Sequence, residues 1–243
     1  MQKIKKNKKI LVSGADSRFC VFLKKNFSNR DVIYSNKKDI NILNYNKLIK
    51  TLREKKIKIF IHIAALSRPM EIHDKKIDLS IQTNIIGTAN VVRACQKLKI
   101  KLIYFSTNYV YPCKRGNYKE TDSLYPINNY AWSKLGGECA VQMLKGSLIL
   151  RLALTNFPFK YKKAIKNVYS SFIFNKDFAK ILPSLIHETG IINIGGKRQS
   201  IYNFARKSNP EIKPMMIKKN SKFPKDSSLN VKKFNQILKK NDK

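Results

Sequence analysis

The chain has 243 residues, of which 43% are hydrophobic, so it can bury a substantial core as one large domain or as one domain with a small annex. No apolar run approaches the roughly 20 residues that cross a bilayer, and we expect no membrane partner. The formal net charge of +35 comes mostly from lysines spread along the whole length. That pattern favours a solvated basic surface over a binding groove, so we expect no specific nucleic-acid partner.

The amino terminus and the cysteines indicate a cytoplasmic protein. Only three apolar residues, Ile10 to Val12, follow the basic start, which is too few for the core of a signal peptide. The four cysteines are scattered, without a C-x-x-C pair and without neighbouring histidine pairs. We therefore expect reduced thiols and no metal site.

A short apolar strand, a tight turn and a helix are predicted from Lys9 to about Lys25. Gly14 permits the turn, and the free N–H groups of a helix that starts there could hold a pyrophosphate. The glycine pattern of dinucleotide-binding turns is incomplete, because Ser17 and Cys20 stand where its second and third glycines would be. An ordinary strand-to-helix turn explains this stretch equally well, so both interpretations stay open.

The second predicted strand, Asp31 to Tyr34, is followed by the polar and basic residues 35–38. A site that selects NAD usually has an acidic residue near the end of this strand, where it binds the ribose hydroxyls. The basic residues suit a 2′-phosphate instead, and they favour NADP(H) over NAD(H) as the cofactor. A helix is predicted next, from Tyr45 to Lys55.

The alternation of strand and helix then continues. Residues 58–65 form a nearly continuous apolar run, typical of a parallel strand covered on both faces, and His62 within it is expected to be a hydrogen-bonded core residue. A helix over 83–95 contains Asn84, which we expect to hold backbone groups. Residues 101–111 form another buried strand, which ends in hydroxyl side chains. This order predicts a parallel sheet with helices on both faces.

Tyr130 and Lys134 lie four residues apart at the start of a predicted helix, which Asn128 or Asn129 is placed to cap. Residues at this spacing share one helical face. A nearby ammonium favours the phenolate and would lower the tyrosine pKa from its usual value of about 10. The tyrosine could then exchange a proton with a substrate hydroxyl or carbonyl. Because the same pair occurs by chance in ordinary amphipathic helices, it needs support from the rest of the chain.

After this helix the pattern becomes less regular. We expect residues 1–152, with the Tyr130 helix, to form a dinucleotide-binding unit, and residues 153–243 to form a shorter region interleaved with it. The fold class is α/β, a Rossmann-type doubly wound parallel sheet with a small C-terminal part. The elements predicted at this end are a buried strand over 147–152, a helix over 178–186, a strand over 191–194 and an amphipathic helix over 231–238.

Several segments, in their order and spacing, resemble the extended short-chain dehydrogenase/reductase family. Within it the likeness is to dTDP-4-dehydrorhamnose reductase and related nucleotide-sugar reductases, from residue 9 to about residue 238. The resemblance implies NAD(P)H-dependent reduction of a 4-keto group on a nucleotide-linked 6-deoxysugar, for polysaccharide or deoxysugar biosynthesis, with the sugar bound by the C-terminal part. The matching segments are 14–20, 62–65, 84–90, 105–111, 118–120, 126–138 and 224–229.

The resemblance also implies roles for single residues. Thr107 would hydrogen-bond the C4 carbonyl oxygen of the sugar, Tyr130 would donate a proton to that oxygen, and Lys134 would bind the nicotinamide ribose and lower the pKa of Tyr130. NADP(H) is the preferred cofactor and NAD(H) the alternative. Besides Tyr130 and Lys134, the residues implied to line the dinucleotide are Gly14, Ser17, Arg18, Phe19, Asp39, Ile40, Ala64 and Ala65. Those implied to lie beside the sugar are Ser67, Thr107, Asn108 and Tyr109.

Two departures and several alternatives accompany the resemblance. Asn108 stands where these reductases usually have aspartate, and Leu154 replaces an aromatic residue that typically flanks the sugar. The alternative functions are a nucleotide-sugar epimerase or dehydratase on the same scaffold, and a non-catalytic, cofactor-binding regulatory subunit.

Family members often pair through a four-helix interface. The helices over 84–98 and 130–144 are therefore candidates for a homodimer contact, although their apolar faces could equally serve the core.

Overall fold

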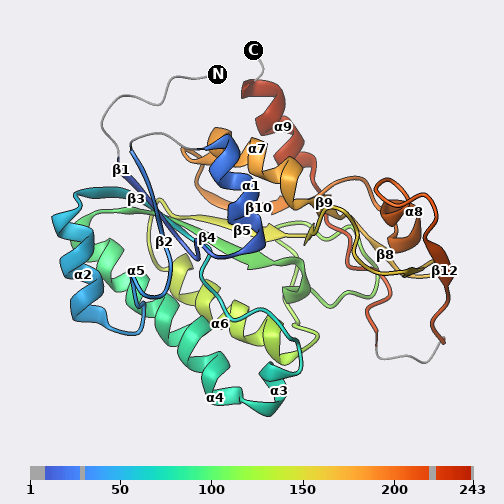
Figure 1. Ribbon diagram of the computed structural model, residues 1–243, viewed down its shortest axis with the longest axis horizontal. Helices are drawn as coiled ribbons and strands as arrows, with labels where there is room; N and C mark the ends of the chain where they lie inside the picture. The colour runs from blue at the N-terminus through green and yellow to red at the C-terminus, as the bar shows by residue number, and fades with distance from the viewer. Residues whose placement is uncertain (1–8, 28–30, 219–222, 242–243) are drawn as a thin grey trace.

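A six-stranded, fully parallel sheet forms the centre of the protein, in the order β10-β5-β4-β3-β1-β2 (Figure 1). The computed structural model describes residues 9–27, 31–218 and 223–241. The strand order reverses at β1, because β2 lies on one side of it and β3 on the other, so the predicted doubly wound topology is confirmed. The strands are β1 (Lys9–Ser13), β2 (Val32–Ser35), β3 (Ile57–His62), β4 (Lys101–Thr107), β5 (Leu148–Leu152) and β10 (Gly190–Ile194).

Helices cover both faces of this sheet (Figure 1). The strand β3 shows why both faces need a cover. Its neighbouring residues Phe60 and Ile61 point to opposite faces, and both are fully buried, each in a separate hydrophobic core. The helices that contribute to the core around Ile61 are α1 (Arg18–Asn26), α7 (Asn175–Leu185) and α9 (Lys232–Asn241). Those that contribute to the core around Phe60 are α2 (Tyr45–Glu54), α5 (Gly87–Leu98) and α6 (Asn129–Gln142).

The connections around β4 differ from the predicted elements. The strand ends at Thr107 rather than continuing to residue 111, and a 3-10 turn, η2 (Asn108–Val110), follows. The Thr107 hydroxyl ends the strand, because it accepts a hydrogen bond from the backbone N–H of Tyr109 at 3.3 Å. Three short helices before α5 were not predicted separately, namely α3 (Ile72–Lys75), α4 (Ile77–Ser80) and the π-helix η1 (Ile81–Ile86).

The C-terminal part combines small sheets with elements of the central sheet. After β5 the chain leaves the sheet, and α7 and β10 then return it to the core, so the two parts are interleaved. A boundary at residue 152 stays a prediction. Outside the central sheet, β8 (Tyr169–Ser170), β12 (Lys213–Met215) and the short helix α8 (Ile201–Ala205) lie together at the right of Figure 1. The two-stranded sheets pair β6 (Leu154–Thr155) with β9 (Ile173–Phe174), β7 (Lys163–Ile165) with β12 (Lys213–Met215), and β8 (Tyr169–Ser170) with β11 (Gln199–Ser200).

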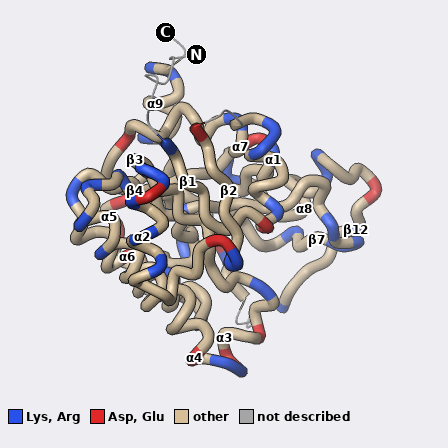
Figure 2. Tube along the Cα trace, turned by 60° about the vertical axis from the view of Figure 1, so that its left-hand side comes forward, with Lys and Arg blue, Asp and Glu red and all other residues tan. Residues whose placement is uncertain are grey.

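Basic residues are distributed over the molecule. Figure 2 shows Lys and Arg on the helices around the sheet, on the C-terminal part and on the loops between them. This distribution agrees with the solvated basic surface expected from the sequence. In the described part of the chain, no helix has the length and apolar character needed to cross a membrane.

Candidate active site

Three side chains singled out by the sequence lie at the carboxyl end of the central sheet. Thr107 is the last residue of β4, while Tyr130 and Lys134 occupy the first turns of α6, which packs against β4. The helix begins where predicted, because the Asn128 side chain accepts a hydrogen bond from the backbone N–H of Ala131 at 2.8 Å. The fold thereby brings Tyr130 close to the Thr107 side chain.

Tyr130 carries a protonated phenol. Burial raises its pKa to about 12, and the nearby Thr107 side chain and the positive charge of Arg68 offset only part of that rise. The prediction that this pKa is lowered was wrong, because desolvation of the phenol outweighs the nearby positive charge. Since the phenol stays protonated at neutral pH, Tyr130 is in the state of a proton donor.

Lys134 is only 3% exposed, and its ammonium lies over the ring of Tyr104, 4.1 Å from the centroid. Burial lowers the pKa of Lys134 to about 7, and the negative charge of Glu138 opposes that shift. Lys134 is therefore divided between its charged and neutral forms near neutral pH. A small change in its surroundings decides which form predominates.

A buried ion pair lies one helical turn beyond Lys134. Arg151 donates to Oε1 of Glu138 from Nη2 at 2.7 Å and from Nε at 3.1 Å, and the Ser106 hydroxyl donates to Oε2 at 2.6 Å. Arg151 Nη1 also donates to the Tyr111 hydroxyl at 2.7 Å. The sequence analysis missed this network. Its signal was an arginine inside the apolar strand β5 and a glutamate four residues after Lys134.

His73, from α3, is a further residue beside the site that the sequence analysis missed. Its ring lies 5.1 Å from that of Tyr130, centroid to centroid, and its Nδ1 is 2.7 Å from the Ser80 hydroxyl oxygen. His73 Nε2 is buried without a hydrogen-bond partner among the described residues. Burial lowers the pKa of His73, which favours the neutral imidazole. No motif pointed to this residue, because its partners come together only in the fold.

The turn after β1 lies against the end of β3. Gly14 has a φ of +77°, and a Cβ there would be 2.9 Å from the backbone nitrogen of Ala64. The same nitrogen donates to the Ser13 hydroxyl at 3.2 Å. Ser17, which replaces a glycine of the usual pattern, caps α1 by accepting from the backbone N–H of Cys20 at 3.3 Å. The turn thus has its glycine where close backbone approach requires it, at the reversal of strand order where ligands of such sheets bind.

Two of the side chains expected along the dinucleotide lie elsewhere. Phe19 is buried in the core, where its ring contacts that of Phe105 at 5.3 Å, and Ile40 is buried in the core of the opposite face. Their side chains therefore pack the protein interior rather than line a ligand. Arg18 is exposed at the start of α1, and Ala65 is partly exposed beyond the end of β3.

The loop after β2 is fixed by its own side chains. Asn36 accepts hydrogen bonds from the backbone N–H groups of Lys38 at 2.9 Å and of Asp39 at 3.2 Å. The Asp39 carboxylate in turn accepts from the backbone N–H of Asn36 at 2.9 Å. The Asp39 carboxylate therefore bonds to the backbone of its own loop. Lys37 and Lys38, in the same loop, are exposed.

The residues expected beside the sugar differ in exposure. Ser67 is exposed, and Tyr109 is half-buried, with a pKa raised to about 12 by desolvation. Asn108 is fully buried, and its amide donates to the carbonyl of Ser227 at 3.0 Å. Asn108 therefore ties the end of β4 to the C-terminal segment. Its expected place beside the sugar stays a prediction.

Arg68, next to Ser67, was not predicted. Its Nη1 donates to the Tyr161 hydroxyl at 3.3 Å, which links the loop after β3 to the C-terminal part. This hydrogen bond, together with the charge of Arg68, lowers the pKa of Tyr161, and the charge acts on the pKa values of Tyr130 and Tyr109 in the same direction. A positive charge therefore lies near the candidate catalytic residues.

Two predicted structural residues are confirmed. His62 is fully buried, with Nδ1 3.0 Å from the Ser13 hydroxyl and Nε2 3.1 Å from that of Thr88. Burial lowers the pKa of His62 to about 3, so it is a neutral core residue. Asn84 holds the backbone of Leu66, accepting from its N–H at 2.8 Å and donating to its carbonyl at 2.9 Å.

Among the described residues, no group of three or more histidine, cysteine or acidic side chains is placed to hold a metal ion.

The arrangement matches known proteins in sequence and in fold. A family model described as "RmlD substrate binding domain" matches residues 8–169. The structure superposes with a TM-score of 0.84 on dTDP-4-dehydrorhamnose reductase from Bacillus anthracis in complex with NADP, which is 24% identical over 95% of this chain and 93% of that one. It superposes with a TM-score of 0.83 on a hypothetical dTDP-4-dehydrorhamnose reductase from Sulfolobus tokodaii, 27% identical over 95% and 94% of the two chains.

A curated relative matches over a shorter stretch. Methionine adenosyltransferase 2 subunit beta from Pongo abelii is 28% identical over 116 residues, which is 47% of this chain. The aligned stretch spans only 34% of the length of that relative.

Proposed function

The chain belongs to the RmlD substrate-binding domain family, and on that premise we propose that it reduces a 4-keto group on a nucleotide-linked 6-deoxysugar with NADPH. The observation that carries this proposal is the position of Thr107, Tyr130 and Lys134 at the carboxyl end of the sheet. Ligands of open α/β sheets bind at that end, where the strand order reverses. In this protein the reversal lies beside the Gly14 turn.

Each of the three side chains has a chemical role in this proposal. NADPH, when bound, supplies the hydride. Tyr130 holds the proton that the carbonyl oxygen requires, because a pKa of about 12 keeps its phenol protonated. The Thr107 hydroxyl, close to that phenol, is placed to hydrogen-bond the same carbonyl oxygen. The charged form of Lys134 stabilises the phenolate that remains after the proton has moved.

The residues at the turn after β1 fit a dinucleotide. Gly14 lets the turn pack against the backbone of β3, where a Cβ would lie 2.9 Å from the Ala64 nitrogen. The first N–H groups of α1, at Arg18 and Phe19, have no acceptor within the helix, so they suit a pyrophosphate. Lys37 and Lys38 are exposed after β2, and the one nearby carboxylate, Asp39, bonds to the loop backbone. These observations support NADP(H) as the preferred cofactor and NAD(H) as the alternative.

The substrate assignment draws on the relatives and on charge. Both solved structures described above are named as dTDP-4-dehydrorhamnose reductases. A net charge of +35 favours the approach of an anionic nucleotide sugar. The test is to mix purified protein, NADPH and dTDP-4-dehydro-6-deoxysugars, and to follow both NADPH consumption and the sugar product. We expect consumption that requires the keto sugar. If the cofactor is retained without net oxidation while the sugar is converted, the epimerase or dehydratase alternative is correct instead.

A second candidate is a non-catalytic subunit that binds a cofactor and regulates another enzyme. The observation that favours it is the curated relative, which is named as a subunit of methionine adenosyltransferase 2. The two candidates differ in their dependence on Tyr130. Stable co-purification with a second enzyme, without keto-sugar reduction and with no effect of Tyr130→Phe on that enzyme, would favour the subunit.

A homodimer through the helical face below the sheet is also proposed. Five apolar side chains of the helices on this face are exposed, namely Ile77, Leu79, Ile81, Ile86 and Trp132. They belong to α4, η1 and α6, which pack against one another, so the exposed residues come from one part of the surface. Light scattering on the purified protein should give the mass of a dimer, and Trp132→Lys should shift it towards the monomer.

A further inference from the structure

His73 is a buried side chain beside Tyr130 that the proposed reaction does not yet use. It belongs to α3, which packs against α6 (Figure 1), and it is 1% exposed. The two rings lie 5.1 Å apart, centroid to centroid, with an angle of 59° between their planes. Their neighbours in the chain are also joined, because the Asn129 amide donates to Oδ1 of Asp74 at 2.8 Å. Two adjacent contacts therefore fix α3 against the first turn of α6.

A hydrogen bond holds one edge of the His73 ring. Its Nδ1 lies 2.7 Å from the hydroxyl oxygen of Ser80, which is the last residue of α4 and is itself buried. The helix α4 packs against both α3 and α6. Two different elements therefore fix the orientation of the imidazole, α4 through the hydrogen bond and α6 through the ring of Tyr130.

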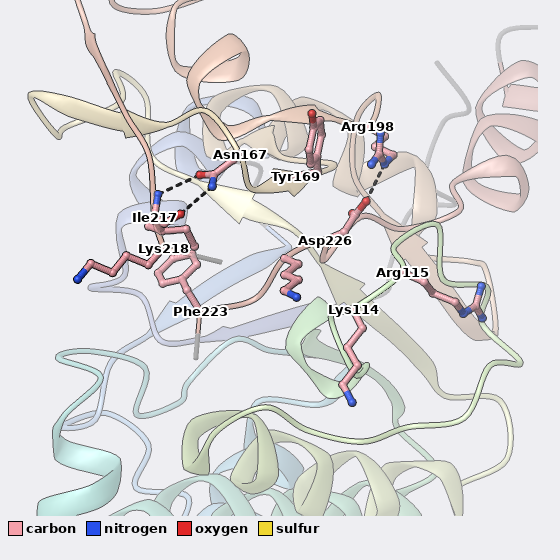
Figure 3. A pocket seen from close by; sticks show the side chains of 10 residues that line it. Lys114, Arg115, Asn167, Tyr169, Arg198, Ile217, Lys218, Phe223 and Asp226 are labelled. Atoms are coloured by element: carbon pink, nitrogen blue, oxygen red, sulfur yellow. Dashed lines mark hydrogen bonds and ion pairs between the residues drawn. The ribbon is translucent and has the colours of Figure 1, made fainter. Parts of the chain in front are cut away.

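The other ring nitrogen of His73, Nε2, has no hydrogen bond. Of the buried side-chain nitrogen and oxygen atoms in the described part of the chain, it alone lacks a partner. Polar side chains elsewhere are paired. In the C-terminal part, for example, the Asn167 amide uses both its oxygen and its nitrogen on the backbone of Ile217 (Figure 3). Because a buried unpaired nitrogen destabilises the fold, a residue that keeps one is a candidate for a further role.

The position of the single proton on the neutral His73 ring decides what Nε2 can do. If Nδ1 carried the proton, Nε2 would present a buried lone pair without any donor. If Nε2 carries it, the Ser80 hydroxyl donates to Nδ1, and the Nε2–H can meet the electron-rich face of the Tyr130 ring. The tilt of 59° allows an edge of the imidazole to approach that face. The second arrangement therefore leaves no polar group of His73 without a partner.

We propose that His73 is a positioning residue for Tyr130, with its Nε2–H directed at the face of the phenol ring. This role rests on the proposed function, in which Tyr130 gives up its proton. Because Nε2 is fully covered, it acts through the phenol and does not touch the substrate. As the proton leaves, negative charge spreads into the ring of Tyr130, and the ring attracts the N–H more strongly. His73 thereby favours proton transfer and leaves substrate binding unchanged.

The first experiment reads the protonated nitrogen of His73 by NMR of the nitrogen-labelled protein, and it does not depend on activity. The chain has only three histidines, so their ring signals can be assigned by substitution. We expect the proton on Nε2, with ring-proton signals shifted upfield by the ring of Tyr130. The shift should persist in Tyr130→Phe and disappear in Tyr130→Leu. The signals of His62, which bonds to Ser13 and Thr88, serve as the control and should change little.

The second experiment measures reduction with two matched variants. His73→Gln places an amide N–H near the position of Nε2, whereas the shorter side chain of His73→Asn places its amide near Nδ1 and reaches only Ser80. We expect His73→Asn to lower kcat about three- to tenfold, the effect of one weak N–H contact, and His73→Gln to recover most of that loss. The KM for the sugar and the affinity for NADPH should stay unchanged in both. Equal losses of kcat in the two variants would mean that His73 only fills space, and would overturn the proposal.

The NMR result decides the contact even if a variant does not fold or the protein reduces no keto sugar, because it is read first on the wild type. A proton on Nδ1, or an upfield shift that survives Tyr130→Leu, would overturn the proposal without touching the proposed function. Failure of keto-sugar reduction would overturn the proposed function and leave the contact between Nε2 and the ring intact. The two proposals therefore fail separately.

Discussion

Glu138 stands between two buried cations: it is paired with Arg151 at 2.7 Å, and Lys134 lies one helical turn before it. The side chains of the pair are 0% and 2% exposed, so water screens neither charge. Glu138 also acts on Lys134, since its negative charge opposes the fall in the pKa of that ammonium. One carboxylate thus stabilises the packing of α6 on the sheet and the charge of a candidate catalytic residue.

The first prediction concerns the stability of this pair. Arg151→Met should lower the free energy of unfolding by about 3–5 kcal/mol, because the Glu138 carboxylate would stay buried without its counter-charge. Adding Glu138→Gln should recover part of the loss, since the neutral amide needs no counter-charge. Urea denaturation of the two single variants and the double variant measures the coupling. Additive losses in this cycle would contradict the prediction.

A second prediction follows from the pKa of Lys134, which lies at about 7. If the charged ammonium is the active form, kcat/KM for NADPH should be constant at acidic pH and fall as the pH rises through about 7. Tyr130, with a pKa of about 12, stays protonated between about pH 5 and 9, so its titration adds no second change of rate to the pH profile. Rates between about pH 5 and 9 measure the profile. A rate that increases through pH 7 would mean that the neutral amine is the active form.

Glu138→Gln tests the cause of that profile. Removing the negative charge takes away the attraction that raises the pKa of Lys134, so the fall in rate should move to lower pH. Lys233→Gln is the matched control, because this exposed lysine of α9 bonds to the Ile191 carbonyl outside the site. Its profile should match that of the wild type. An unchanged profile in Glu138→Gln would show that burial alone sets the pKa.

The fold could be predicted from the sequence more fully than the candidate site, and the reason is physical. Strand and helix signals are local, as the Asn128 cap and the apolar run of β3 illustrate. The contacts that define the site join distant segments: Asn108 bonds to the Ser227 backbone across 119 residues, and Arg68 to Tyr161 across 93. No spacing rule predicts such partners.

The prediction of a lowered pKa for Tyr130 was wrong for a related reason. The spacing of Tyr130 and Lys134 indicated a neighbouring charge, but it held no information about burial. Desolvation is the largest cause for both groups, and it raises the pKa of Tyr130 while lowering that of Lys134. Phe19 and Ile40 illustrate the same limit, since a position in a motif does not say whether a side chain turns towards a ligand or into the core.

The third prediction concerns the proton donor. Tyr130→Phe should lower kcat for keto-sugar reduction by about 10²–10⁴, the usual contribution of a positioned acid. Affinity for NADPH should change little, because the ring and its contact with His73 remain. Single-turnover rates and NADPH titration separate the two effects. A variant that keeps its full rate would assign proton donation to another group, and Tyr109, half-buried with a pKa of about 12, would be the next candidate.

The last prediction concerns the turn that faces β3. Gly14 and Gly146 both have a φ of +77°, but a Cβ at Gly14 would lie 2.9 Å from the Ala64 nitrogen, whereas nothing lies within 4 Å of one at Gly146. Gly146→Ala should therefore show only the cost of a left-handed residue, about 1–2 kcal/mol. Gly14→Ala should lose more stability than that and should also lose affinity for NADPH. Thermal unfolding and NADPH titration of both variants make the comparison. If the two variants lose equal stability and both keep NADPH affinity, then the close approach of Gly14 to β3 matters to neither the fold nor the cofactor.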